Sequence, residues 1–439
     1  MQINDADKAH ISGAFEPLKS PAVGGVAAQR LPQVIETVSE MLVAIEKRGM
    51  DAVMDYSRRL DRWEDTDIEV GPRQLAASGD NLPQPLRDAM AISVDHTRRF
   101  AQEQRQRLVD FEVELTPGVV TGQKQIPVSR VGAYLPGGRF PILTSAAMTI
   151  GVAKAAGVGS VIACTPPVSA TGGNPAIMYS AHLAGVDRLF ALGGVQALAA
   201  MAFGLLGDQP IDVLVGAGNA YVAEAKRQLY GRVGIDLLAG PSEVAAIADN
   251  TASPEIVAAD LLAQAEHGPQ SPASLVTTSR DFGAAVIAQI DKQLEVLETR
   301  DIAGAAWRDY GTVYWAEDKE TAAQLMDTLA PEHLEVITDN DEFFARRLRN
   351  YGSLFLGSWS TVAYSDKGIT GTNHVLPTGR SARYTGGLSV ARFLKTVTYQ
   401  HVSANATNAV ASAVETIAGY EGMAAHKASA TRRLEAVRR

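Results

Sequence analysis

Cysteine is almost absent from this chain of 439 residues, which has one thiol, Cys164. A single cysteine cannot form a disulfide within the chain, and this fits a reducing compartment. Cys164 lies in the apolar run SVIACTPP, which predicts a buried strand end. Because a thiol in apolar surroundings is a poor nucleophile, the sequence argues against covalent cysteine catalysis.

Long hydrophobic runs are also missing. No apolar stretch reaches the length of about 18 residues that is typical of a membrane-spanning helix. The N-terminal stretch MQINDADKAHISGAF has no basic region followed by an apolar region, as a signal peptide would. We therefore expect a cytoplasmic protein that does not act at a membrane.

Charge of one sign is not concentrated anywhere. The net charge of −9 is spread over the length, without a basic stripe or a long run of like charges. This distribution argues against a nucleic-acid partner and against binding to an anionic membrane surface. With 46% hydrophobic and 20% charged residues, the chain has the composition of an ordinary globular protein. Single cores stop growing near roughly 250–300 residues, so two to four domains are expected.

Short apolar runs alternate with helical patterns from residue 130 onward. The first series is VGAYL, TSAAMTIGVAKAAG, SVIAC, NPAIMYSAHLAG, RLFAL, VQALAAMAFG, DVLVG and NAYVAEAKRQLY. A second series runs from VAAIA to SLFLG. Strands that alternate with helices at this spacing indicate βαβ units and parallel sheets. The expected fold class is therefore α/β, with two modules in which strands and helices follow one another in a similar order.

The expected division of the chain has four parts. The N-terminal segment is 1–30, the first α/β module with its helical support combines 31–130 and 240–380, the second, Rossmann-like module is 131–239, and a C-terminal helical tail is 381–439. The tail is rich in alanine and charge. It could pack on a neighbouring subunit as easily as on the core of its own chain.

Gln264 and His267 lie three residues apart in LLAQAEHG, on the last turn of an expected helix. Ser253 as N-cap and Pro254 at N1 mark the start of this helix, and Gly268 marks its end. Spacing i, i+3 places both side chains on one face. An amide oxygen and an imidazole suit zinc or another first-row divalent metal. The alternative is a histidine that only contacts the last carbonyls of its helix.

Two further clusters carry groups that suit an oxidation site. In APEHLEV, Pro331 ends a helix and leaves Glu332 and His333 on a loop at the start of a strand. Histidine suits a general base near neutral pH, and glutamate can activate water. The alternative there is a surface glutamate beside a partly buried histidine. The loop YSDKGITGTNHVLPTG carries Asp366 and His374, and long loops inside a compact domain are usually functional.

The remaining candidates give weaker signals. Glu421 and His426 lie in the helical pattern EGMAAHKASATRR, where two solvated positions are the simpler interpretation. The glycine-rich turns LPGGR, LGGVQ, GAGN and AGPSE each follow a strand, where glycine lets the backbone approach phosphate or ribose. None is a GxGxxG motif followed by an acidic residue about 20 positions on. A dinucleotide would therefore bind in an atypical way.

The set of motifs resembles the histidinol dehydrogenase family. The resemblance covers nearly the whole chain from about Val34 onward, in the order of the family. It is carried by VGAYLPGG, GGVQALAAMAFG, GAGNAYVAEAKR, AGPSEV, DLLAQAEHG, APEHL, GSLFLG, GTNHVLPT, GGLSV and EGMAAHK.

The resemblance implies a zinc enzyme that uses two NAD to oxidise a primary alcohol through an aldehyde to a carboxylate. It implies two incomplete Rossmann-like modules, similar to the aldehyde dehydrogenase architecture, with smaller helical segments. It also implies a domain-swapped homodimer with shared active sites, in which the tail packs on the partner.

Site residues follow from the same resemblance, position by position. The implied zinc ligands are Gln264, His267 and Asp366, with His426 arriving from the other subunit. The implied catalytic acid/base pair is Glu332 and His333. The implied NAD-contacting positions are Tyr134, Gln196 and Asn219. The implied positions around the substrate are Ser242, His374 and Glu421.

Some features differ from the biosynthetic members of the family. The spacing from Asp366 to His374 is one residue longer, Arg139 follows PGG, and GVVTGQKQIPV precedes the first strand. These features resemble the branch that includes sulfopropanediol 3-dehydrogenase, which oxidises 2,3-dihydroxypropane-1-sulfonate to sulfolactate. Arg139 would suit a small anionic alcohol, since guanidinium matches sulfonate or carboxylate geometry.

Two alternatives to that function stay open. The first is oxidation of L-histidinol to L-histidine, because Glu421 and AGPSEV could provide an acidic group for a substrate ammonium. The second is a non-catalytic homologue that binds zinc or nucleotide.

Overall fold

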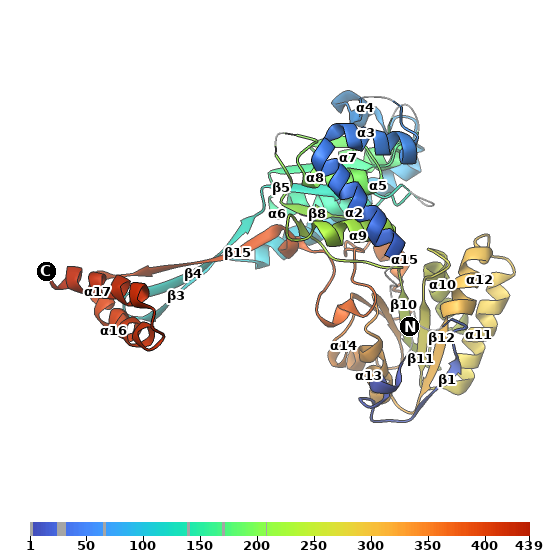
Figure 1. Cartoon of the computed structure of the whole chain (residues 1–439). Helices are drawn as coiled ribbons and strands as arrows, with labels where there is room; N and C mark the ends of the chain where they lie inside the picture. Colours follow the sequence, from blue (N-terminus) through green and yellow to red (C-terminus); the bar gives the residue numbers. More distant parts are fainter. Residues whose placement is uncertain (1–2, 24–31, 65–66, 138–140, 169–171, 208) are drawn as a thin grey trace.

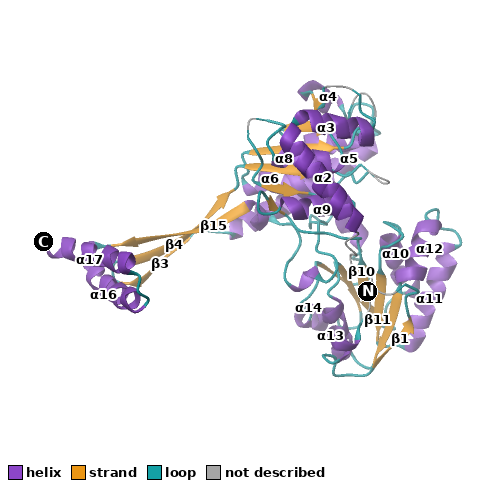
Figure 2. Cartoon of the chain, in the orientation of Figure 1, coloured by secondary structure: helices purple, strands orange, loops and turns teal. Residues whose placement is uncertain are grey.

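The computed structural model describes residues 3–23, 32–64, 67–137, 141–168, 172–207 and 209–439. Its body contains two six-stranded sheets with helices on both faces, and an arm projects from this body (Figures 1 and 2). Both large sheets are parallel except for one edge strand each. The expected α/β class is therefore confirmed. No described helix is both long and apolar enough to span a membrane.

The first large sheet has the strand order β2-β7-β6-β5-β8-β9. Its strands are β2 (Glu69–Val70), β5 (Arg130–Tyr134), β6 (Ser160–Thr165), β7 (Arg188–Ala191), β8 (Val213–Val215) and β9 (Gly234–Ile235). The helices of this module are α2 (Pro32–Arg48), α3 (Met50–Tyr56), η1 (Ser57–Asp61), α4 (Pro72–Ala77), α5 (Gln84–Arg107), η2 (Ala147–Gly151), α6 (Val152–Ala156), α7 (Pro175–Ala184), α8 (Gly194–Ala202) and α9 (Ala220–Leu229). One apolar core lies on each face of the sheet.

The second large sheet has the strand order β1-β12-β11-β10-β13-β14. Its strands are β1 (Phe15–Lys19), β10 (Val244–Ala248), β11 (Ala273–Thr277), β12 (Thr312–Ala316), β13 (His333–Ile337) and β14 (Ser353–Leu356). The helices around it are α1 (Asp5–Lys8), α10 (Pro254–Ala265), α11 (Arg280–Leu294), α12 (Arg300–Tyr310), α13 (Lys319–Leu329), α14 (Asp341–Arg347), α15 (Val362–Asp366) and the 3₁₀ turn η3 (Ser381–Arg383). All five residues of β10, β11 and β13 are buried, as expected for strands covered on both faces.

The arm consists of a three-stranded antiparallel sheet and two helices at its tip (Figure 1). Its strands are β3 (Phe111–Thr116), β4 (Val119–Pro127) and β15 (Leu394–Val402), the last preceded by the 3₁₀ turn η4 (Val390–Phe393). Helices α16 (Ala404–Tyr420) and α17 (Ala424–Arg438) pack on each other through a small core of Ala411, Ala430 and Leu434. The C-terminus lies at the tip of the arm, far from the body.

The structure corrects two parts of the expected division. Residues 32–107 do not support the 240–380 sheet, because α2 packs on α8 and α9, and β2 pairs with β7 of the 131–239 sheet. The apolar face of α2, with Val38 and Ile45, joins the core that contains Leu198. The segment 381–439 is not wholly helical, because β15 pairs with β4 over nine residues.

Candidate functional site

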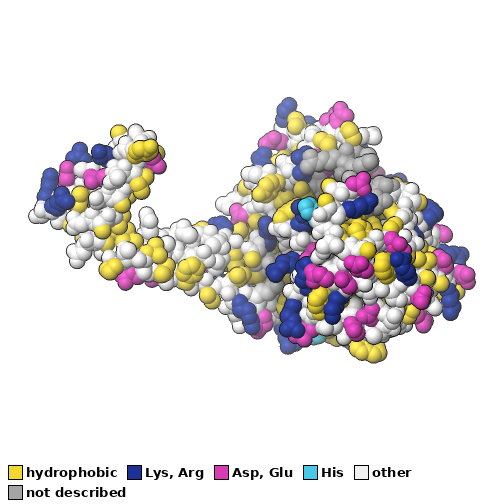
Figure 3. All heavy atoms as spheres, turned by 90° about the horizontal axis from the view of Figure 1, so that it is seen from below, with side chains coloured by type: hydrophobic (Ala, Val, Ile, Leu, Met, Phe, Trp, Pro, Cys, Tyr) yellow, Lys and Arg dark blue, Asp and Glu magenta, His cyan; other side chains and the backbone are white. Residues whose placement is uncertain are grey.

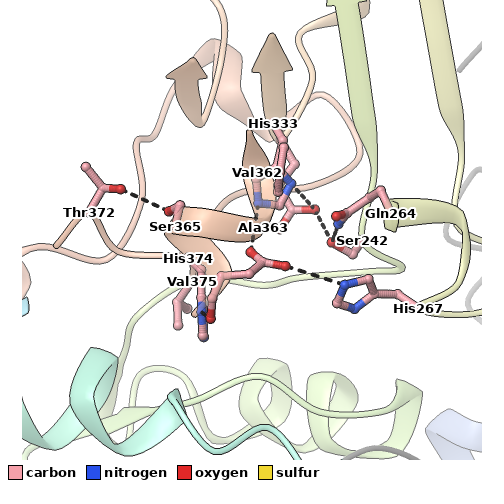
Figure 4. A network of polar contacts seen from close by, with 12 residues as sticks. Ser242, Gln264, His267, His333, Val362, Ala363, Ser365, Thr372, His374 and Val375 are labelled. Carbon is pink, nitrogen blue, oxygen red and sulfur yellow. Dashed lines mark hydrogen bonds and ion pairs between the residues drawn. The ribbon is translucent and has the colours of Figure 1, made fainter. Parts of the chain in front are cut away.

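Polar side chains gather at the amino ends of β10 and β13. These two parallel strands are neighbours, with Val244 opposite His333. Ser242 therefore lies just before one strand, while Glu332 and His333 lie at the start of the other. The last turn of α10 brings Gln264 to the same place, and Figure 4 shows Ser242, Gln264 and His333 side by side.

A chain of hydrogen bonds connects these side chains. The Gln264 Nε2 donates to Ser242 Oγ, and Ser242 Oγ donates to Glu332 Oε2 at 2.8 Å. The backbone N–H of Glu243 donates to the same carboxyl oxygen at 2.8 Å. Burial raises the pKa of Glu332 well above its ordinary value, against the effect of these two donors. Because Nε2 of Gln264 donates to Ser242, its amide oxygen is the atom of this side chain that could act as a ligand.

His333 is almost fully buried, and its two ring nitrogens have different surroundings. Nδ1 lies 3.0 Å from the carbonyl oxygen of Glu243, which can only accept a hydrogen bond, so Nδ1 carries the proton. Nε2 is buried and has no hydrogen-bond partner among the described residues. Burial lowers the pKa of His333, which favours the neutral ring. A neutral imidazole with a free lone pair can accept a proton from a substrate.

Asp366 lies between the histidines of the site. Its Oδ2 is 3.4 Å from Nε2 of His267, and its Oδ1 is 3.7 Å from Nε2 of His333. Burial alone would raise the pKa of Asp366, but the hydrogen bond from His267 and the nearby histidines lower it to about 2. Asp366 is therefore a carboxylate at neutral pH. In Figure 4, a dashed line ends at the ring of the labelled His267.

The spacing of Asp366 and His267 fits a shared metal ion. Two ligand atoms that are each about 2.1 Å from a tetrahedral zinc are separated by about 3.4 Å. The observed separation of Oδ2 and Nε2 is 3.4 Å. No three His, Cys, Asp or Glu side chains of the described residues form a complete metal site. Two further nitrogen or oxygen ligands would complete a tetrahedral site around the pair.

His374 and its loop connect the site to the other large sheet. Nδ1 of His374 lies 3.0 Å from the backbone oxygen of Asp366, and Thr144 Oγ1 donates to that oxygen at 2.7 Å. Asn373 Nδ2 donates to the backbone oxygen of Met148 at 2.8 Å. The segment after β5 is thus hydrogen-bonded to the segment that carries Asp366, which brings the two modules together at the site.

Tyr134 and Gln196 lie at the carboxyl ends of the strands of the first large sheet. The Tyr134 hydroxyl accepts from the Gly194 N–H at 3.1 Å, and burial raises the pKa of Tyr134 to about 12. Gln196 Nε2 donates to Asp61 Oδ2 at 2.9 Å, while Oε1 of Gln196 is buried without a partner among the described residues.

Asn219 lies on the next loop of the same edge and caps α9. Its side chain accepts from the N–H groups of Tyr221 and Val222 at 3.0 and 3.1 Å. The strand order changes direction between β5 and β8, and this is where open α/β sheets bind ligands. At Gly216, with φ of 122°, an added Cβ would lie 2.2 Å from the backbone oxygen of Tyr134. Only glycine allows this close approach of the two loops.

Within one chain, the structure brings together some of the expected residues and not others. Those that meet at the amino ends of β10 and β13 are Ser242, Gln264, His267, Glu332, His333, Asp366 and His374. Glu421 and His426 are exposed on the arm, away from this cluster. Arg139 lies outside the described residues.

Several residues that support the site were not among those predicted from the sequence. Asp61 accepts from the Gly193 N–H at 3.1 Å and also from Gln196, but it lies far from both in the sequence. The N–H of Glu243 donates a hydrogen bond to the carboxyl group of Glu332, and the carbonyl oxygen of Glu243 orients the ring of His333. Glu335 is a charged residue type inside the otherwise apolar strand HLEVI, a pattern that could have singled it out.

Comparison with known proteins gives a consistent result. Residues 26–434 match the profile of the histidinol dehydrogenase family. The chain belongs to the histidinol dehydrogenase family. Membership in that family makes the chain an NAD-dependent dehydrogenase.

Individual members of the histidinol dehydrogenase family match over nearly their full length. A histidinol dehydrogenase homolog of Ruegeria pomeroyi is 49% identical over 92% of this chain and 93% of its own. A sulfopropanediol 3-dehydrogenase of the same organism is 47% identical over 91% of this chain and 92% of its own. The crystal structure of histidinol dehydrogenase from Elizabethkingia anophelis is 33% identical, with a TM-score of 0.88, and covers 95% of each chain.

Proposed function

We propose that this family member oxidises a primary alcohol through an aldehyde to a carboxylate, with zinc and two NAD. The observation that carries this proposal is the buried, unpartnered Nε2 of His333 beside the Asp366 and His267 pair. Such a nitrogen is placed to accept a hydroxyl proton. Zinc would be held by Gln264, His267, Asp366 and the partner subunit's His426, and would polarise and orient the alcohol oxygen.

The residues of the chain account for both oxidation steps. In the first step, His333 accepts the hydroxyl proton at Nε2 while the carbon gives its hydride to NAD, which yields an aldehyde and NADH. Glu332, as a carboxylate, would then take a proton from a water molecule while the hydroxide adds to the aldehyde carbon. His333 would return its proton to the aldehyde oxygen, which forms the hydrate and restores the neutral ring. In the second step, the hydrate would lose a proton to His333 and a hydride to a second NAD, which gives a carboxylic acid; this acid then loses its proton to solvent and becomes the carboxylate. Hydride transfer requires a dry site, and Glu332 and His333 are both buried.

We place the nicotinamide cofactor at the carboxyl ends of β5, β7 and β8. Tyr134, Gln196 and Asn219 lie on this edge, and the unpartnered Oε1 of Gln196 supports a polar contact there. The hydrogen bonds of Thr144 and Asn373 to the opposite module support transfer of a hydride across the junction.

The arm supports a homodimer with shared active sites. All six residues of β3 are exposed, and at the tip of the arm Tyr420 is 97% exposed. Figure 3 shows hydrophobic side chains along the arm and at its tip. Such an apolar surface on a projecting element favours contact with another subunit. In the dimer we propose, the partner subunit's His426 and the partner subunit's Glu421 reach the site described above.

For the substrate, we propose a small anionic alcohol such as 2,3-dihydroxypropane-1-sulfonate, with Ser242, His374 and the partner subunit's Glu421 around it. The relative named sulfopropanediol 3-dehydrogenase supports this choice. Lys367 follows Asp366 and is exposed. Burial lowers the pKa of His374, the carboxylate of Asp366 opposes this effect, and the charge of Lys367 lowers the pKa further. Arg139 would add a second cation.

Oxidation of L-histidinol is the second candidate. The solved structure of a histidinol dehydrogenase with a TM-score of 0.88 supports it, as does the partner subunit's Glu421, which could receive a substrate ammonium.

Assays with both alcohols decide between the two substrates. The kcat/KM for NADH formation is measured with the zinc-loaded protein and 2,3-dihydroxypropane-1-sulfonate or L-histidinol. Turnover of the sulfonate at an ordinary enzymatic rate, about 10 per second, supports the proposal. The same rate with histidinol and none with the sulfonate would replace it with the second candidate. A properly folded, zinc-loaded protein that oxidises neither would favour a non-catalytic homologue.

A further inference from the structure

Two carboxyl side chains that the proposed chemistry does not use lie next to the candidate site. Glu335 is fully buried on β13, two residues after His333. Asp260 is half-buried on α10, one turn before Gln264. Because side chains alternate along a strand, Glu335 and His333 point to the same face of the sheet. Ile337, on that same face, packs in the core formed with α10 and α15.

In each of these carboxyl groups, one oxygen accepts a hydrogen bond and the other has no partner among the described residues. Asp260 Oδ1 accepts from Thr361 Oγ1 at 2.8 Å, and Glu335 Oε1 accepts from the Val362 N–H at 3.1 Å. Asp260 Oδ2 and Glu335 Oε2 are both buried without a hydrogen-bond partner among the described residues. Two buried carboxylates repel each other if both are ionised, whereas one proton between them satisfies both oxygens.

We propose that Glu335 is a neutral carboxylic acid that donates its proton to Asp260, and that this pair positions the zinc-binding residues. Burial raises the pKa of Glu335 well above its ordinary value, and the nearby carboxyl of Asp260 raises it further. Burial also raises the pKa of Asp260, while the hydrogen bond from Thr361 lowers it and favours the carboxylate. Glu335 is therefore the proton donor of the pair and Asp260 the acceptor.

The pair connects the three elements that carry the proposed metal and proton-transfer residues. Asp260 belongs to α10, which carries Gln264, and Glu335 belongs to β13, which begins with His333. Their acceptor oxygens hold Thr361 and Val362, the N-cap and first residue of α15. This helix has only five residues and ends at Asp366. A shift at its start would therefore move the carboxylate of Asp366.

The matched variants are E335Q and E335L, with E342Q as a control at an exposed carboxyl of α14. In E335Q the amide nitrogen donates to Asp260 and the amide oxygen accepts from Val362, so zinc affinity and kcat should stay close to those of the parent protein. In E335L both partners lose their hydrogen bonds, and zinc affinity should fall about 10- to 100-fold, as for other residues that support metal ligands. Zinc affinity is measured by competition with a chelator, and E342Q should leave it unchanged.

Infrared difference spectroscopy tests the shared proton directly. The carbonyl stretch of a protonated carboxylic acid should be present in the parent protein and in E342Q, and one such band should be lost in E335Q. If E335Q keeps this band, Glu335 is not a neutral carboxylic acid. If E335Q loses as much zinc affinity as E335L, the proposed neutral state of Glu335 is also wrong. Unchanged zinc affinity in a folded E335L would overturn the positioning role.

The inference rests on the proposed zinc site, but the two can fail separately. If E335L does not fold, the zinc affinity of E335Q and its difference spectrum still decide. If the parent protein binds no zinc, the proposed function fails and with it the positioning role, while the infrared band still shows whether Glu335 holds a proton.

Discussion

His333 differs from its neighbours in the site because one of its ring nitrogens is buried and has no partner among the described residues. The other nitrogen is oriented by the carbonyl oxygen of Glu243. This arrangement fixes the tautomer in which Nε2 has a free lone pair. This Nε2 lies 3.7 Å from Oδ1 of Asp366. In the proposed function, the reacting oxygen of the substrate lies beside these two atoms.

Replacement of His333 by asparagine separates proton transfer from metal binding. His333→Asn should lower kcat about 10²- to 10⁴-fold, since asparagine cannot accept the hydroxyl proton. Zinc content should stay unchanged because His333 is not one of the proposed ligands. NADH formation and metal analysis on the same preparation check both expectations. An unchanged kcat would remove His333 from the chemistry.

At the scale of single residues, chemical type and spacing made Gln264, His267, Glu332 and His333 candidates, and the family resemblance supplied their predicted roles. Type, spacing and resemblance were not sufficient to assign protonation. The proton on Nδ1 of His333 depends on Glu243, which is 90 positions away in the sequence. The raised pKa of Glu332 depends first on burial, which is a property of the packed structure.

Among the elements, the β8–α9 connection shows how a buried charge pair fixes a binding loop. Lys226 on α9 forms a buried ion pair with Asp236, and its Nζ also donates to the backbone oxygen of Gly216 at 2.9 Å. Asp236 Oδ2 accepts from the Gly216 N–H at 2.8 Å. The loop that ends at Asn219 is thus held from both sides.

Removal of one partner of this pair should be costly. Lys226→Met leaves Asp236 as a buried carboxylate without its cation, which should reduce the free energy of unfolding by about 3–5 kcal/mol. The matched control is Arg99→Ala, which breaks an exposed i, i+4 pair with Asp95 and should cost at most about 1 kcal/mol. Urea unfolding followed by circular dichroism measures both. Similar costs for the two variants would contradict the structural role of the buried pair.

The elements of the body could be predicted from sequence because their periodicity is local. The run VAAIA became β10, and Asn219 caps α9 at the start of NAYVAEAKRQLY. The arm strands could not be predicted in this way. In β15 the residues are mostly exposed and polar, and the strand exists because it pairs with β4, about 270 positions earlier. The sequence GVVTGQKQIPV precedes the first strand of the module and contains all of β4.

On the scale of the whole molecule, the arm carries Glu421 and His426 away from the site of its own chain. Both side chains are exposed. A histidine placed in this way can complete a metal site only in another subunit. The proposed shared site therefore makes a prediction about mixed dimers.

Co-expression of two inactive variants tests this sharing. His426→Ala should lower zinc occupancy, and His333→Asn should abolish proton transfer, so each variant alone should be nearly inactive. In a mixed dimer, one of the two sites combines an intact His333 with an intact His426 of the partner subunit. Random pairing should therefore restore about a quarter of the parent activity. No recovery in dimers shown to be mixed would exclude a shared site.

The sequence by itself determined the class of the fold, most of the helices and strands of the body, and the residue types available for chemistry. These properties depend on local periodicity, capping and side-chain chemistry, which act over a few neighbouring residues. Only the tertiary structure decided that residues 32–107 pack with the 131–239 sheet, that residues 394–402 form an arm strand, and that Asp260 and Glu335 accept hydrogen bonds from the adjacent residues Thr361 and Val362. Those outcomes depend on which apolar faces and strand edges pair across hundreds of residues, and on the burial that follows.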